Sequence, residues 1–114
     1  MKITELLKKE AVKLNVNATD KDNVIDQLID LHVKAGNVTD AAVYKKAILA
    51  REAEGTTSVP GGIAIPHART SAVANAGLAA VTVDGGVDYD SEDGSKTDLL
   101  FMIAAPENSN NLYM

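Results

Sequence analysis

The chain has 114 residues, a formal net charge of −5 at pH 7 and no cysteine. Hydrophobic residues make up 46% and charged residues 24% of it, a balance that is typical of a globular domain and excludes a disordered polar chain. The lack of cysteine excludes disulfides, thiolate catalysis and zinc–thiolate sites, and the negative charge argues against a nucleic-acid partner. Neither an apolar run of membrane-spanning length nor the apolar region of a signal peptide is present. A single soluble, cytoplasmic domain over residues 1–114 is therefore predicted.

The first third of the chain is predicted to hold a short helix, a strand and a longer helix. Residues 3–9 have an amphipathic helical pattern, and residues 11–15 have the pattern of a short strand. Thr19, followed by Asp22, forms a weak capping box and predicts that a helix begins there. Apolar residues then recur at helical spacing up to Gly36, a residue suited to ending a helix.

A second helix and three strands are predicted after Gly36. Thr39 is the candidate N-cap of this helix, and Gly55 is its predicted end. The sequence GTTSVPGG that follows has the composition of a loop. Three apolar runs then have the character of strands, at residues 63–65, 77–86 and 98–106. Because these runs are continuous rather than alternating, we expect helices on both sides of the sheet.

His67 is the candidate functional residue, at the end of the sequence GGIAIPHA. Pro66 has a fixed φ and favours an extended backbone at Ile65, so His67 is predicted to be the first residue beyond a strand end. Binding and catalytic groups collect at such ends, and imidazole is both a base and a nucleophile near neutral pH. On spacing alone, a histidine that only makes a hydrogen bond within a loop remains the simpler interpretation.

The other candidate groups are one histidine and two arginines. His32 lies on the apolar side of the first long helix and is assigned to the edge of the core. Two histidines without carboxylates at ligand spacing do not predict a metal site. Arg51 and Arg69 could bind a phosphate, because a guanidinium group offers bidentate hydrogen bonds to phosphate oxygens. A surface ion pair is the alternative role for each arginine.

The sequence GGIAIPHA closely resembles the phosphorylation-site motif of the enzyme IIA domains of the fructose/mannitol class. These domains belong to the bacterial phosphoenolpyruvate-dependent sugar phosphotransferase system (PTS). AILAREAEGTTSVPGGIAIPHAR, with its Arg-Glu pair sixteen residues before the histidine, and DLLFMIAAPENSNN match as well. The resemblance spans nearly the whole chain, and fructose-type members are the most similar. It implies an α+β fold of three layers, α/β/α, with a small mixed β-sheet flanked by helices, and neither a cofactor nor a metal.

The resemblance also implies the function and the partners. In the family, the matching histidine accepts a phosphoryl group from phospho-HPr, a small carrier protein. It passes the group to a IIB domain, which phosphorylates sugar imported by the membrane IIC domain. His67 would thus be the phosphoryl acceptor, through Nε2, and Arg51 the group that stabilises the phosphate. HPr and IIB would be direct partners in sugar uptake, with fructose favoured as the sugar.

The end of the chain departs from the family pattern. The family has a second active-site histidine forty-six residues after the first, and this chain has Tyr113 there. The helices that follow in the family are also missing, which predicts an uncovered sheet face that favours self-association. Two other functions stay open. One is a nitrogen-type regulatory IIA module, in which phosphorylation of His67 switches protein contacts without sugar transport, and the other is an inactive remnant.

Overall fold

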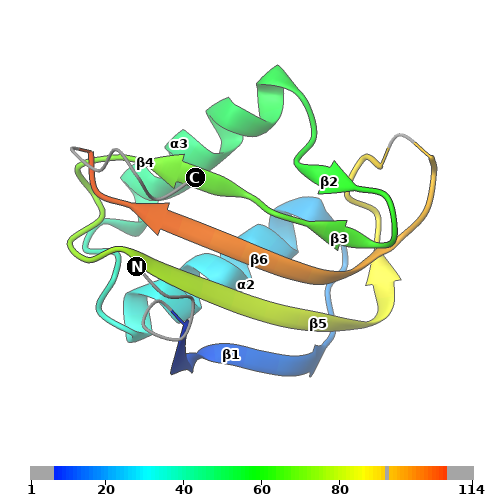
Figure 1. Cartoon of the computed structure of the whole chain (residues 1–114), viewed down its shortest axis with the longest axis horizontal. Coiled ribbons are helices and arrows are strands. Elements are labelled where there is room, and N and C mark those ends of the chain that lie inside the picture. The colour runs from blue at the N-terminus through cyan, green and yellow to red at the C-terminus, as the bar shows by residue number, and fades with distance from the viewer. Residues whose placement is uncertain (1–6, 92, 108–114) are drawn as a thin grey trace.

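The computed structural model describes residues 7–91 and 93–107, which form two helices and one six-stranded sheet (Figure 1). In chain order the elements are β1 (Leu7–Val16), α2 (Lys21–Lys34), α3 (Ala41–Glu54), β2 (Ser58–Val59), β3 (Ile63–Ala64), β4 (His67–Arg69), β5 (Gly77–Val87) and β6 (Thr97–Ala105). The three strands predicted from apolar runs are confirmed as β3, β5 and β6, each within one residue of its predicted ends. The short strands β2 and β4 lie in segments for which no strand was predicted.

The sheet is mixed, with strand order β1-β5-β6-β3-β2, and β4 pairs with β6 beyond β3. β5 and β6 form its centre as an antiparallel pair, in which Ala79 lies opposite Met102. β1 pairs with β5 in parallel, β3 and β4 both pair with β6 in parallel, and β2 closes the other edge antiparallel to β3. A small mixed sheet with helices, the predicted α+β class, is confirmed.

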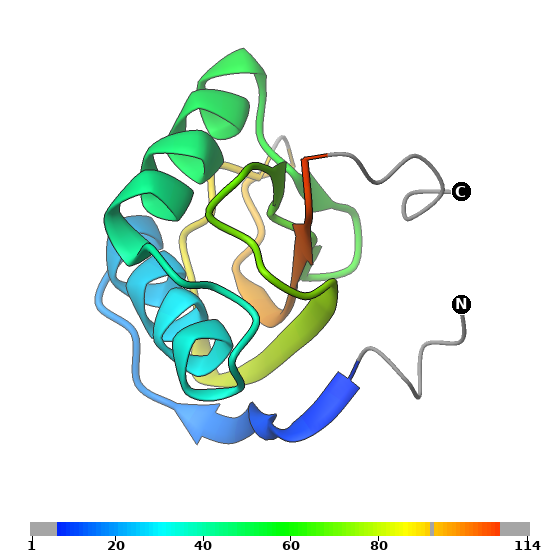
Figure 2. The same ribbon diagram turned by 90° about the vertical axis from the view of Figure 1, so that its left-hand side faces the viewer.

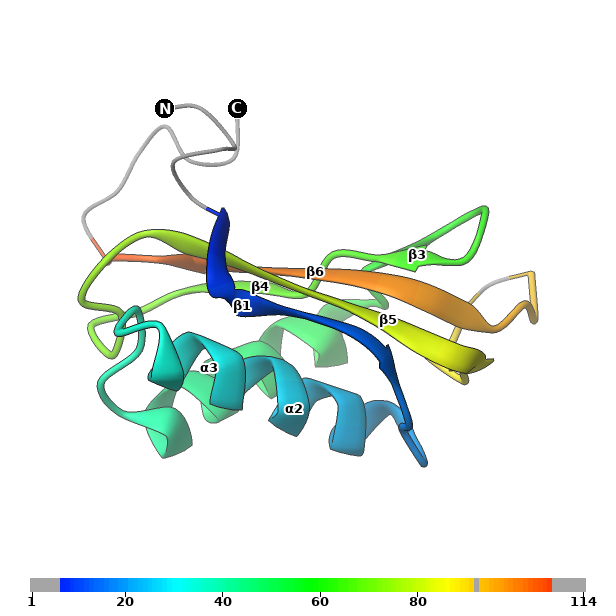
Figure 3. The ribbon, with the colours of Figure 1, turned by 90° about the horizontal axis from the view of Figure 1, so that it is seen from below.

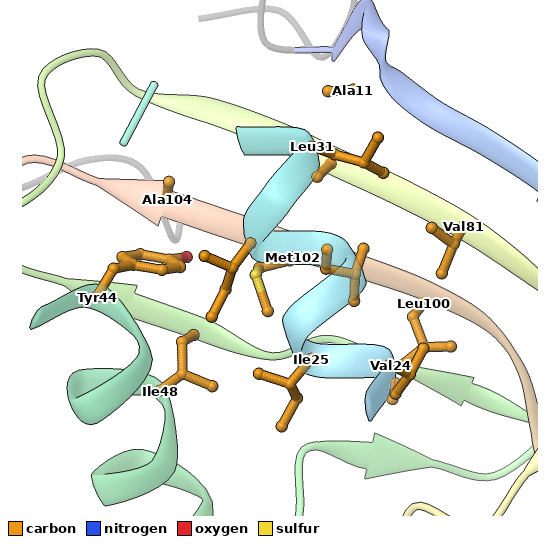
Figure 4. Packing of buried hydrophobic residues seen from close by; sticks show 14 of the residues in the cluster. Ala11, Val24, Ile25, Leu31, Tyr44, Ile48, Val81, Leu100, Met102 and Ala104 are labelled. Atoms are coloured by element: carbon orange, nitrogen blue, oxygen red, sulfur yellow. The ribbon is translucent and has the colours of Figure 1, made fainter. Parts of the chain in front are cut away.

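Both helices pack against the same face of this sheet (Figure 2 and Figure 3). Buried side chains from α2, α3 and the strands meet there in one core, with Ile25, Ile48 and Met102 fully buried (Figure 4). Along β6, residues 100, 102 and 104 are fully buried, whereas residues 99, 101 and 103 on the opposite face are apolar and half-buried. The described part of the chain therefore has two layers, and the second helical layer of the predicted α/β/α arrangement is not found within it. Apolar residues on both faces made the runs continuous even though one face carries no helix here.

The N-terminal helix predicted for residues 3–9 is wrong for residues 7–9, because these residues belong to β1. Residues 3–6 lie outside the described part of the chain. An isolated helix of two turns is marginal in water, and parallel pairing with β5, for example Val12 with Ala80, satisfies the backbone instead. The strand predicted at residues 11–15 is confirmed as part of β1. Within the described ranges, no helix is long and apolar enough to cross a membrane.

The two long helices are confirmed, but each N-cap is one residue later than predicted. Asp20, not Thr19, accepts the backbone hydrogen bond that caps α2, and Asp40, not Thr39, does so for α3. An aspartate carboxylate satisfies an unpaired N–H and also interacts favourably with the positive end of the helix dipole. At the other ends, the predicted glycines lie at the C-cap of α3 and one residue beyond the C-cap of α2.

His32 lies deeper than the core edge to which its sequence pattern assigned it, because it is fully buried. Its Nε2 is 2.9 Å from the carbonyl oxygen of Met102, and its Nδ1 is 3.2 Å from Nδ2 of Asn37. A carbonyl oxygen can only accept, so Nε2 carries the proton and Nδ1 accepts from the amide. Both ring nitrogens of the neutral imidazole are thus satisfied inside the core, and burial lowers the pKa of His32.

Buried His32 is expected to make the fold less stable as the pH falls below about 6.5, the ordinary pKa of histidine. Since its folded-state pKa is lower than its unfolded pKa, the unfolded chain binds the extra proton first. Stability is then lost by up to about 1.4 kcal/mol per pH unit as the pH falls towards the folded-state pKa. Urea unfolding between pH 7.5 and pH 5 measures this slope. His32→Gln should flatten it, and equal slopes in both proteins would contradict the assignment.

Candidate functional site

The segment that carries His67 pairs with β6 in two separate short strands, β3 and β4. Ile63 of β3 lies opposite Leu99 of β6, and His67 of β4 lies opposite Ile103. Pro66 interrupts the ladder because it has no N–H, yet its carbonyl oxygen still accepts the N–H of Ile103 at 3.0 Å. His67 is therefore the first residue of a new three-residue strand, and the prediction that it lies beyond the last strand residue needs this correction.

The imidazole ring of His67 is oriented by the backbone two residues before it. Its Nδ1 is 2.9 Å from the carbonyl oxygen of Ile65, and the residue is half-buried. Because the carbonyl can only accept a hydrogen bond, Nδ1 carries the proton of the neutral ring. The lone pair then lies on Nε2, and this tautomer makes Nε2 the nucleophilic atom of the ring.

A hollow of about 490 Å³ lies beside His67, between β4 and the C-terminal half of α3. The two elements are neighbours in the fold (Figure 1), although sixteen residues separate Arg51 from His67. The lining combines two cations, one carboxylate, the imidazole and small apolar residues: Ala47, Ala50, Arg51, Glu54, His67, Ala68 and Arg69. The fold thus brings together the histidine and both arginines that the sequence singled out.

Arg51 lies in the last turn of α3, and its Nη1 donates a hydrogen bond to the carbonyl oxygen of Gly55 at 2.9 Å. A cation there interacts favourably with the negative end of the helix dipole and with carbonyl groups that have no partner within the helix. Arg51 is half-buried as a residue and lines the hollow. Arg69 is exposed on β4, two residues after His67 and therefore on the same side of that strand.

Glu52 is the residue near this site that the sequence reasoning missed as a structural element. It is 9% exposed and follows Tyr44 and Ile48 at four-residue spacing on the buried face of α3. A carboxylate on an apolar helix stripe was the available signal, because such a group must find polar partners inside the protein. Its partners are Lys21 and Thr57.

Within the described ranges, no cluster of three or more histidine, cysteine or carboxylate side chains could hold a metal ion. Tyr113, which the family resemblance aligns with a second histidine, lies outside the described residues.

The chain is similar to known proteins in both sequence and fold. Residues 5–114 match the family described as "Phosphoenolpyruvate-dependent sugar phosphotransferase system, EIIA 2". The chain is 48% identical over 114 residues to the "PTS system fructose-specific EIIABC component" of Bacillus subtilis (strain 168). This match covers the whole of the present chain but only 18% of that relative.

Two solved structures share the fold. The nitrogen regulatory protein IIA-Ntr of Neisseria meningitidis has a TM-score of 0.85 and 28% identity, over 94% of this chain and 73% of that one. A complex of enzyme IIAMtl and phosphorylated enzyme IIBMtl from Escherichia coli gives a TM-score of 0.78 and 28% identity, over 91% and 74%. Because the family model matches nearly every residue, the chain belongs to the EIIA 2 family of the phosphoenolpyruvate-dependent sugar phosphotransferase system.

Proposed function

We propose that this chain is a phosphocarrier that accepts a phosphoryl group from phospho-HPr on Nε2 of His67 and passes it to a IIB domain. The observation that carries the proposal is the hydrogen bond from Nδ1 of His67 to the Ile65 carbonyl, which leaves the lone pair on Nε2. Family membership supports the general role in phosphotransfer. One structural neighbour is itself a IIA component in complex with a phosphorylated IIB component, which supports IIB as the acceptor.

The geometry supports a direct transfer of the phosphoryl group onto the His67 ring. Nε2 of His67 attacks the phosphorus in line while the bond between the phosphorus and the donor group of phospho-HPr breaks, so one bond replaces another. The His67 ring gains positive charge as the new bond forms. The Ile65 carbonyl, already bound to Nδ1–H, stabilises that charge. When the phosphoryl group is passed on to the IIB domain, the same positive charge makes the His67 ring a good leaving group.

Arg51 is proposed to bind the phosphoryl oxygens from the end of α3. It lines the hollow next to His67, and charge-assisted hydrogen bonds from a guanidinium group to phosphate are about twice as strong as neutral ones. Arg69 brings a second cation to the same hollow, whereas Glu54 contributes a negative charge at its edge. The hollow therefore offers more positive than negative groups to an incoming phosphoryl group.

Fructose uptake is the proposed context, because the relative that is 48% identical is named as fructose-specific. A regulatory role of the nitrogen type is the second candidate, favoured by the TM-score of 0.85 with IIA-Ntr. Both roles require phosphorylation of the same histidine. They differ in whether the phosphoryl group is passed on to a IIB domain.

The test uses phosphoenolpyruvate, enzyme I and HPr with the intact chain. We expect one acid-labile phosphoryl group per chain, mapped to His67, and its rapid loss when a fructose-type IIB domain is added. A stable phosphoprotein that ignores IIB would favour the regulatory role. Absence of any phosphoryl group on the folded chain would contradict the proposal as a whole.

Arg51→Lys is expected to slow phosphoryl transfer about tenfold although it keeps the positive charge, because the planar two-pronged donor is lost. Rapid-quench measurement of transfer from phospho-HPr gives the rate. Lys46→Ala is the matched control, since it removes a cation from an exposed position of α3 outside the hollow. Unchanged rates for Arg51→Lys in both directions would show that Arg51 serves only the helix end.

A further inference from the structure

The carboxylate of Glu52 holds the segment after α3 against the end of that helix. Its Oε2 accepts the Thr57 hydroxyl at 2.5 Å, and its Oε1 accepts the Thr57 backbone N–H at 3.2 Å. Oε1 also lies 2.9 Å from Nζ of Lys21 at the start of α2. Both oxygens of a side chain that is 5% exposed are thus satisfied, as a buried carboxylate requires.

The backbone of Thr57 connects this carboxylate to the candidate active site. The carbonyl oxygen of Thr57 accepts the N–H of Ile65 at 3.1 Å. The carbonyl oxygen of Ile65 in turn accepts Nδ1 of His67 at 2.9 Å. Hydrogen bonds therefore connect the Glu52 carboxylate to the His67 imidazole through two intermediate residues, Thr57 and Ile65.

The same carboxylate also places Arg51. Arg51 precedes Glu52 in the last turn of α3 and binds the carbonyl of Gly55, two residues before Thr57. Glu52 holds Thr57 and so fixes the short segment 55–57. This segment contains Gly55, whose carbonyl binds Arg51, and Thr57, whose carbonyl leads through Ile65 to His67. The Glu52–Thr57 contact therefore lies between a residue that binds the guanidinium and a residue that leads to the imidazole.

The charge of Glu52 is stabilised by Lys21, which also contacts Asp90 and Tyr89. Lys21 Nζ lies 3.2 Å from a carboxylate oxygen of Asp90 and 4.6 Å from the ring centre of Tyr89. The Tyr89 ring is fully buried, and burial together with the nearby Glu52 charge raises the pKa of its hydroxyl. Lys21 offsets two carboxylate charges at once, which stabilises Glu52 in a place where a lone charge would be costly.

We propose that Glu52 and Thr57 are positioning residues, which fix the Nδ1–H tautomer and the ring orientation of His67 through the Ile65 carbonyl. This inference rests on the proposed function for its kinetic consequence, but not for its structural one. Neither residue lines the hollow, so neither is expected to touch the phosphoryl group.

The decisive variant is Thr57→Val, which removes the hydroxyl and keeps the branched shape. Nitrogen-15 NMR of the His67 ring should show a smaller fraction of the Nδ1–H tautomer than in the parent chain. The rate of transfer at saturating phospho-HPr should fall about tenfold, because the nucleophile is no longer held in its reactive orientation. The phospho-HPr concentration that gives half this rate should stay unchanged. Thr57→Ser, which retains the hydroxyl, should restore both properties.

Thr56→Val is the matched control. Its hydroxyl also makes part-buried hydrogen bonds: it donates to the carbonyl of Tyr89 at 2.8 Å and accepts the backbone N–H of Ser58 at 3.2 Å. Neither bond belongs to the chain of hydrogen bonds from Glu52 through Thr57 and Ile65 to His67. A parental tautomer in folded Thr57→Val, or equal losses in both valine variants, would overturn the proposal. If the parent chain takes no phosphoryl group, the proposed function fails, and the NMR comparison alone decides the positioning role.

Discussion

Replacement of His67 by alanine is expected to abolish phosphorylation of this chain completely. Among the described residues that line the hollow, no other side chain offers a nitrogen lone pair, because a guanidinium group is not deprotonated in proteins. The step is a covalent transfer to one atom, so loss of that atom leaves no slower version of it. Incubation with phosphoenolpyruvate, enzyme I and HPr, followed by detection of acid-labile phosphate, measures the effect.

The matched control for this experiment is His32→Gln. His32 is fully buried, and both of its ring nitrogens are engaged with Met102 and Asn37, so it offers no nucleophile to a donor protein. Circular dichroism establishes whether each variant is folded. We expect the label to persist in His32→Gln. A label that survives in His67→Ala and is lost in folded His32→Gln would overturn the assignment.

Local sequence patterns correctly predicted the helices and strands that are determined by residues close together in the chain. The helical apolar spacing of α2, the glycine that ends α3 and the apolar runs of β5 and β6 all depend on residues close in the chain. The errors came where tertiary contacts decide. Residues 7–9 join β1 because β5 offers a parallel partner. Asp20 caps α2 in place of its neighbour Thr19, a choice between two good caps that spacing alone cannot make.

The candidate site was only partly visible in the sequence for the same reason. Pro66 before His67 is a local signal for a strand end, but pairing with β6 makes His67 the first residue of β4, which the local pattern did not predict. His67 lies near Arg51 only because α3 lies beside β4. In the sequence, this proximity was implied by the family resemblance alone. The role of Glu52 depends on contacts with Lys21, thirty-one residues earlier, and with the loop that follows α3. The arrangement of helices on only one face of the sheet in the described part of the chain could not be predicted either, because an apolar run does not show which face of a strand a helix covers.

Gly77 is the second position where a large effect is expected, and its importance is likewise invisible to local patterns. It begins β5 opposite Ala104 of β6, and the side chain of Asn37 packs directly on it. A Cβ atom at this position would overlap with Nδ2 of Asn37 and lie 2.6 Å from its Cγ. Glycine is thus required here for the close approach of a neighbouring side chain, not for its backbone conformation.

Asn37 cannot move aside without breaking other bonds. It is fully buried, its Nδ2 donates to Nδ1 of His32, and its backbone N–H donates to the carbonyl of His32 at 2.9 Å. Its carbonyl oxygen also accepts the N–H of Ala74 at 2.8 Å. Any displacement therefore reaches His32, which is in turn bound to the backbone of β6.

Gly77→Ala is expected to lower the free energy of unfolding by about 3 kcal/mol, since it combines overpacking with the loss of a buried hydrogen bond. Urea unfolding at pH 7.5, where His32 is neutral in both states, measures the change. The double variant Gly77→Ala/Asn37→Ala provides the control, because truncation of Asn37 removes the atoms that the new methyl group meets. Its loss should be smaller than the sum of the two single losses, as coupled neighbours require. Additive losses would mean that the methyl group is accommodated elsewhere and that Asn37 is not what requires glycine at position 77.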